Sequence, residues 1–193
     1  MSVTYTRRQQ RRRRGVYAAG VLVFALLCDK LFVLLGADRL SVWSDFGGRS
    51  EAFDKEPLST ALRELDEETL CTVSREMLLL DEDAIHSKTL CGYRYYLHVA
   101  LLRGGESEAH AVVSGFANAH ALSKHAEKTE LRWFEWGAIR ALMTGRESAC
   151  DIALRDVFRR TMVTRLPEVE AALAALHGRH NSGSGAPGEP AET

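Results

Sequence analysis

Three glutamates lie close together near the end of the segment 57–70: Glu64, Glu67 and Glu68. Carboxylate oxygens are the ligands that hard divalent cations prefer, and Mg²⁺ typically binds one or two of them together with water and phosphate oxygens. Arg63 precedes Glu67 by four residues, a spacing at which the two side chains meet on one helix face. These residue types predict either a divalent-metal site or an acidic, solvated surface.

The segment 57–70 has the pattern of an amphipathic helix. Pro57 suits the first helical position, where its missing N–H is not needed. Small and apolar side chains share one face of the helical wheel, namely Leu58, Ala61, Leu62, Leu65 and Thr69. The three glutamates fall within an arc of about 100° away from that face. We therefore expect one face of the helix to enter the core and the other to present the carboxylates.

A glycine pair, Gly47-Gly48, follows a predicted short strand over 41–46 and precedes a polar loop over 49–56. Glycine has no Cβ, so its backbone can approach a ligand closely. We expect this pair to form a loop next to the acidic helix.

Gly48, Asp54 and the run Arg63-Glu64-Leu65-Asp66-Glu67-Glu68 resemble the motif of the Nudix family, G-x5-E-x7-R-E-U-x-E-E-x-G-U, where U is apolar. Three departures are visible. Asp54 replaces the first glutamate, eight residues instead of seven separate it from Arg63, and Leu70 replaces the last glycine. Because glycine suits the left-handed conformation that ends many helices, we expect this helix to continue or to end differently.

The resemblance implies an α/β/α sandwich with a mixed β-sheet in a single domain. It also implies hydrolysis of a diphosphate linkage in a nucleoside diphosphate derivative, with Mg²⁺ or Mn²⁺ as the cofactor. The implied metal ligands are Glu64, Glu67 and Glu68, with the carbonyl of Gly48 as a further ligand.

The implied catalytic residues are Glu64, Glu68 and Arg63, with Arg63 orienting the carboxylates. The group that accepts the proton stays open, because Glu127 and Glu130 on a later segment are further candidates. The substrate-binding residues are also open: tyrosines at 93, 95 and 96 have faces that suit a nucleobase, but they equally suit a strand in the core.

Other segments show the elements that must position this helix. Two apolar stretches, 17–27 and 31–36, predict strands joined by a turn at 28–30, and the charges of that turn argue against a membrane span. Later segments predict strands over 72–80, 89–103 and 130–136, helices over 137–143 and 148–176, and either a helix or a loop with a strand over 108–126. The expected organisation is a disordered basic arm (1–15), one domain (16–177) and a disordered tail (178–193).

The net charge of −1 conceals an uneven distribution. Six of the 25 basic residues lie in the first 14 positions, which contain no acid, so the rest of the chain carries 19 basic against 26 acidic residues, or −7. Arginines over 7–14 would neutralise phosphates along RNA; a nuclear localisation signal, contact with an anionic membrane and a solubilising arm are the alternatives. The basic arm makes RNA cap hydrolysis a second hypothesis, and a non-catalytic binding module with the same fold is a third.

Four cysteines are spread along the chain without a CxxC pair, which predicts free and mostly buried thiols rather than a zinc site. A cytoplasmic or nuclear location follows from that expectation.

Overall fold

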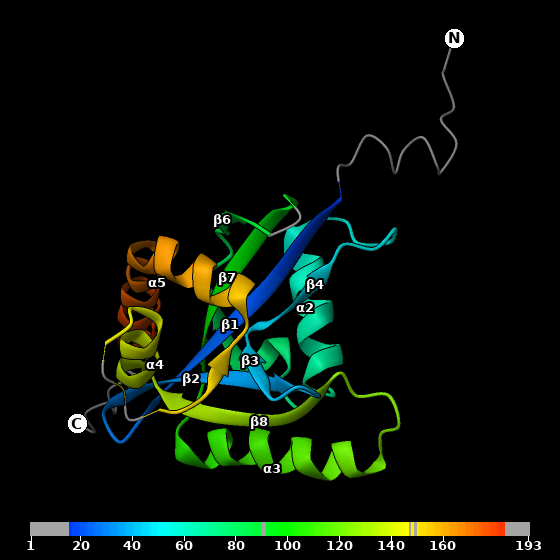
Figure 1. The fold of residues 1–193 in the computed structure, drawn as a ribbon. Coiled ribbons are helices and arrows are strands. Elements are labelled where there is room, and N and C mark those ends of the chain that lie inside the picture. Colours follow the sequence, from blue (N-terminus) through cyan, green and yellow to red (C-terminus); the bar gives the residue numbers. More distant parts are fainter. Residues whose placement is uncertain (1–15, 90–91, 147, 149, 184–193) are drawn as a thin grey trace, which may run out of the picture.

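The computed structural model describes residues 16–89, 92–146, 148 and 150–183. The predicted arm over 1–15 and the tail beyond residue 183 lie outside the described residues. The elements are β1 (Tyr17–Leu27), β2 (Lys30–Asp38), β3 (Val42–Ser44), β4 (Phe46–Arg49), α2 (Pro57–Glu68), η1 (Arg75–Met77), β5 (Leu78–Leu80), β6 (Ile85–Lys88), β7 (Arg94–Leu102), α3 (Glu106–Leu122), β8 (Lys128–Glu135), α4 (Trp136–Met143), β9 (Ala153–Leu154) and α5 (Asp156–Gly183) (Figure 1).

The strand β1 is the centre of a mixed sheet. It pairs with β2 in an antiparallel hairpin and with β7 in parallel. Cys28 and Asp29 form the hairpin turn with φ of 47° and 60°, the left-handed values that a two-residue turn between twisted strands requires. The predicted hairpin is confirmed, and it places a buried double strand beneath the acidic helix.

One edge of β1 has two successive partners. Residues 18–21 of β1 pair with β4, whereas residues 23–27 pair with β2. The sheet therefore forks near Leu22, and Asp45 lies between the ends of β3 and β4 at this fork. The candidate site is built around the fork.

Helices cover both faces of the sheet, as the α/β/α sandwich requires (Figure 1). Alternate residues of β1 enter different cores because successive side chains point to opposite faces. Leu22 and Phe24 pack with α4 and α5, whereas Val21 and Val23 pack with α2 and α3. The expected fold class is confirmed.

Several element predictions need correction. The glycine pair is not a loop, because Gly47 and Gly48 belong to β4 and pair with β1. The stretch 72–80 is a strand only over its last three residues, and 89–103 is a strand only from Arg94. The ambiguous stretch 108–126 is largely the helix α3. The helix expected over 148–176 begins at Asp156 and continues to Gly183, so the start of the predicted tail is helical.

The cysteines also differ from expectation. Those in the described residues are free thiols, but Cys28 and Cys71 are exposed and Cys150 is half-buried. Cys28 and Cys71 both have positive φ in tight turns, which places them at the surface. In the part of the chain that the structure describes, no helix has the length and apolar character needed to cross a bilayer.

Candidate functional site

Helix α2 ends in a way that the sequence did not predict. The N–H of Cys71 bonds to the carbonyl of Asp66 at 2.8 Å, and the N–H of Leu70 bonds to that of Glu67 at 3.4 Å. This is the pattern of a Schellman cap, in which one residue adopts the left-handed conformation. Leu70 does so with φ of 54°. The helix therefore ends where a glycine would have ended it, at a cost of about 1–2 kcal/mol for a residue with a Cβ.

The guanidinium of Arg63 is held by three carboxylates and one backbone carbonyl. It lies 3.1 Å from Asp54 Oδ2 and 2.9 Å from the carbonyl oxygen of Arg49. The same side chain lies 2.9 Å from Glu64 Oε1 and 2.9 Å from Glu67 Oε2. Arg63 therefore holds two of the predicted metal ligands, as expected for an orienting residue.

Asp54 anchors the loop before α2 rather than facing the carboxylates. It accepts hydrogen bonds from the N–H of Glu51 at 2.7 Å and from Thr60 Oγ1 at 2.8 Å, besides its contact with Arg63. Although burial opposes ionisation, these bonds hold its pKa below the ordinary value. The residue that replaces the first glutamate of the motif thus positions Arg63.

Glu64 is packed against the strand β4. A Cβ on Gly48 would collide with the Glu64 carboxylate, so glycine leaves room for this side chain in its present position. Burial raises the pKa of Glu64, and Arg63 acts in the opposite direction. Gly48 therefore contributes space for a carboxylate, and it does so from a strand rather than from the loop that we expected.

Glu68 is buried and forms an internal ion pair. Its Oε1 lies 3.3 Å from Lys128 Nζ, and the side chains of these residues are 7% and 1% exposed. Its Oε2 accepts a hydrogen bond from the N–H of Gly47 at 2.8 Å. Burial raises the pKa of Glu68 to about 7, against the opposing effects of Lys128 and Gly47. Lys128 also donates to Ser44 Oγ at 2.9 Å and to the carbonyl oxygen of Asp45 at 3.3 Å.

Asp45 is buried at the point where β3 ends and β4 begins. Tyr95 donates its hydroxyl proton to Asp45 Oδ2 at 2.5 Å, and burial raises the pKa of the aspartate. Gly20 and Gly47 face the Tyr95 hydroxyl, where a Cβ on either would clash. Tyr95 is therefore a buried hydrogen-bond donor, so the core interpretation of this tyrosine holds.

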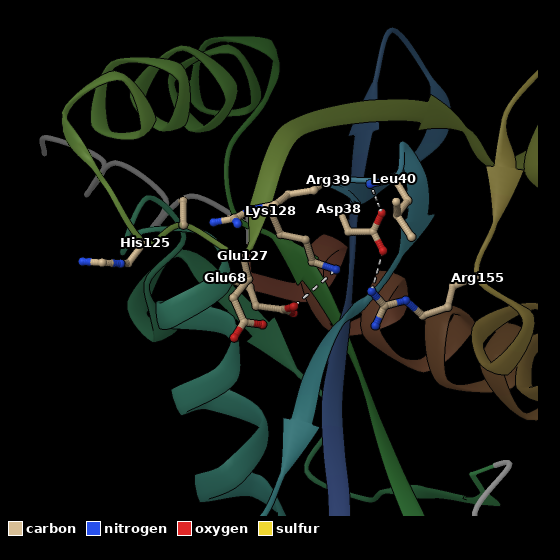
Figure 2. A pocket seen from close by; sticks show the side chains of 9 residues that line it. Asp38, Arg39, Leu40, Glu68, His125, Glu127, Lys128 and Arg155 are labelled. Atoms are coloured by element: carbon tan, nitrogen blue, oxygen red, sulfur yellow. Dashed lines mark hydrogen bonds and ion pairs between the residues drawn. The ribbon is translucent and has the colours of Figure 1, made fainter.

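A cavity of about 450 Å³ opens next to the Glu68–Lys128 pair (Figure 2). Its lining carries both signs of charge and consists of Asp38, Arg39, Leu40, Glu68, His125, Ala126, Glu127, Lys128 and Arg155. Figure 2 shows the side chain of Arg155 directed at Asp38, with 2.8 Å between Nη2 and Oδ2. Cationic groups suited to phosphate thus stand beside carboxylates.

The structure brings the predicted residues to one region but not into one metal cluster. Among the described residues, no three His, Cys, Asp or Glu side chains are arranged as a ready metal site. The side chain of Glu67 is 58% exposed, in contrast to the more buried side chains of Glu64 and Glu68. The three glutamates therefore do not share one solvated face, because Glu64 and Glu68 turn toward β4.

The two later candidates for the proton acceptor differ in position. Glu127 lines the cavity and lies close enough to Glu64 to contribute to its raised pKa. Glu130 is exposed, is paired with Arg132 and is absent from the cavity lining. Glu127 thus remains a candidate on geometric grounds.

Comparison with known proteins identifies the architecture. No protein-family model and no curated protein matches the sequence. Among solved structures, the Ap4A hydrolase of C. elegans in a binary complex is similar with a TM-score of 0.54 at 17% identity, covering 82% of this chain and 98% of that one. A MutT/nudix family protein from Enterococcus faecalis is similar with a TM-score of 0.52 at 14% identity, over 86% of this chain and 68% of that one. The chain has the Nudix fold.

The Nudix fold agrees with the motif on α2, but the motif did not reveal every residue of the site. Asp45 and Tyr95 gave no recognisable spacing, because they are 50 residues apart in the sequence and come together only once β4 and β7 have both paired with β1. Lys128 was missed because a lysine next to Glu127 and Thr129 looks like part of a solvated strand end. A buried lysine is rare, and no pattern in the sequence signals this one.

Proposed function

We propose that this chain is a divalent-metal-dependent hydrolase that cleaves a diphosphate linkage in a nucleotide derivative. The observation that carries the proposal is the geometry of α2, where Arg63 is anchored by Asp54 and in turn holds Glu64 and Glu67 beside a close-fitting Gly48. The likeness to an Ap4A hydrolase supports a substrate with linked phosphates, and makes dinucleoside polyphosphates the first class to test.

The residues present fit a hard divalent cation such as Mg²⁺ or Mn²⁺. Carboxylates outnumber cations in this region: Glu68 and Asp45 lie near the ammonium of Lys128, whereas Glu64 and Glu67 share the guanidinium of Arg63. Glu64 and Glu67 have the carboxylate oxygens that such ions prefer. When bound, the ion supplies charge neutralisation at phosphate and a more acidic water.

The chain's own groups have separable roles in this proposal. Arg63 keeps the carboxylates of Glu64 and Glu67 at fixed positions, which lowers the entropy lost on binding. Glu64 or Glu127 accepts the proton of the attacking water. Arg39 and Arg155, on the cavity wall, face the phosphates that do not react.

The proposal predicts hydrolysis in the presence of Mg²⁺ or Mn²⁺ from at least one member of a panel: dinucleoside polyphosphates, nucleotide sugars, nucleoside triphosphates and capped RNA. The measurement is phosphate or nucleotide release. Glu64→Gln is expected to lower kcat by at least about 100-fold, the scale of a lost acid–base or metal-holding group.

Glu130→Gln is the matched control, because it removes the same charge from an exposed residue outside the cavity. It should keep near-wild-type activity, and circular dichroism should show both variants folded. An absence of release from the whole panel would overturn the enzyme in favour of a binding module.

A further inference from the structure

The slot that holds Lys128 is built by residues from three strands. Gly36 on β2 faces the aliphatic part of the lysine, where a Cβ would lie 2.9 Å from Lys128 Cδ. The ring of Phe46 on β4 lies beneath the ammonium, with its centroid 5.9 Å from Nζ. Lys128 itself begins β8. The side chain of Lys128 therefore lies in a space that exists because Gly36 has no side chain.

The ammonium of Lys128 binds oxygen atoms that lie where the strands β3 and β4 separate. The carbonyl of Asp45, between β3 and β4, accepts from Lys128 Nζ, as does the hydroxyl of Ser44. The third partner is the Glu68 carboxylate, 3.3 Å away. A buried ammonium is stable only when it is paired and hydrogen-bonded in this way.

The same contacts occupy both oxygens of Glu68. One is bound by Lys128 and the other by the N–H of Gly47. Glu64 and Glu67 differ, because their known partner is the guanidinium of Arg63, and Glu67 is largely open to solvent. The three glutamates of the motif therefore differ in their cationic partners: Lys128 pairs with Glu68, whereas one arginine, Arg63, is shared by Glu64 and Glu67.

We propose that Lys128 is a built-in cation that takes the place of a divalent ion at Glu68. Glu68 then positions Lys128, and the ions of the proposed hydrolase bind to Glu64 and Glu67 without Glu68 as a ligand. This inference rests on the proposed function for the ion and for its binding at Glu64 and Glu67, but it can be tested without a substrate because ion binding is measured directly.

Mn²⁺ binding to the full chain, followed by electron paramagnetic resonance and isothermal titration calorimetry, tests the proposal. Glu68→Gln should change the Mn²⁺ affinity less than twofold, whereas Glu64→Gln should weaken it about tenfold or more, the scale of an altered metal site. Lys128→Met frees the Glu68 carboxylate and should add one Mn²⁺ per chain. Lys124→Met, four residues away and exposed, is the control for charge and should leave the stoichiometry unchanged.

A second measurement covers the case in which a single variant fails to fold. Glu68→Gln and Lys128→Met each leave a buried charge unpaired, and the double variant Lys128→Met/Glu68→Gln removes both charges. The double variant should regain the thermal stability that each single variant loses, and it should bind as many Mn²⁺ ions as the wild type. A double variant that loses one Mn²⁺ ion, or a Glu68→Gln variant with Mn²⁺ affinity as weak as that of Glu64→Gln, would overturn the proposal, whatever the substrate panel shows.

Discussion

At the scale of single residues, the site depends on glycines that make room for other side chains. Gly48 faces Glu64, Gly36 faces Lys128, and Gly20 and Gly47 face the hydroxyl of Tyr95. The sequence shows that glycines precede the acidic helix, but it does not show which side chains face them: Glu64 comes from α2, Tyr95 from β7 and Lys128 from β8. The pattern therefore predicted a loop where the structure has a closely packed strand.

Gly48→Ala should displace the carboxylate of Glu64, because the new methyl group occupies its position. We expect kcat/KM to fall by about 100-fold, as a displacement of about 1 Å at a site can produce. Stability should fall by less than the roughly 1–3 kcal/mol typical of an overpacked core, because the methyl group displaces only the end of the Glu64 side chain. Steady-state kinetics and urea denaturation measure the two effects. Gly137→Ala, whose Cβ has only an ordinary contact at 3.8 Å, should change neither by a comparable amount.

At the scale of elements, local patterns predicted more than long-range pairings did. The β1–β2 hairpin and α2 follow from apolar runs and helical periodicity, and both are confirmed within a few residues. The short strand β4 was missed because its pairing with β1 is decided by residues far along the chain. Helix α3 was ambiguous because only Ala109, Val112 and Phe116 are buried along it.

Strand β7 contains a histidine that should make stability depend on pH. Burial lowers the pKa of His98 below 6.5, although its contact with the carbonyl of Asp81 acts in the opposite direction. The unfolded chain therefore binds a proton at this residue at a higher pH than the folded chain does. Stability due to His98 is present above pH 6.5 and is lost as the pH falls below it, by at most about 1.4 kcal/mol per pH unit.

His98→Leu removes this titration and fills the buried position with an apolar side chain. The free energy of unfolding, measured in urea between pH 7 and pH 5, should fall less steeply for the variant than for the wild type. His110→Gln, on an exposed position of α3, controls for the loss of an imidazole. Equal slopes for the wild type and His98→Leu would contradict the prediction.

At the scale of the whole molecule, the charges divide the chain into a basic arm over 1–15 and an acidic body, which is the rest of the chain. The body contains the site, and its acidic residues include the buried Asp45 and Glu68 and the half-buried Glu64. The arm over 1–15 lies outside the described residues, so the hypothesis that it binds RNA rests on its charge alone. If it binds RNA, its six arginines should act through phosphates and weaken with salt.

Deletion of residues 1–14 should lower the activity on capped RNA far more than the activity on a free nucleotide derivative, and the difference should shrink as salt is raised. Initial rates at two salt concentrations measure this. A variant with all six arginines of the arm changed to lysine keeps the charge and should behave like the wild type. Equal losses on both substrates would argue against a role for RNA.

The parallel ladder between β1 and β7 also has a consequence for how the chain is made. Tyr17 pairs with Arg94 and Phe24 with Leu101, so the central strand lacks one neighbour until most of β7 has left the ribosome. During that interval α2 can cover only one face of the β1–β2 hairpin, because the helices α4 and α5 that cover the other face come later in the chain. Pairings between distant residues form slowly, and uncovered apolar strands self-associate. The growing chain therefore exposes one edge of β1 until β7 is complete, and one apolar face of the hairpin until α4 and α5 follow.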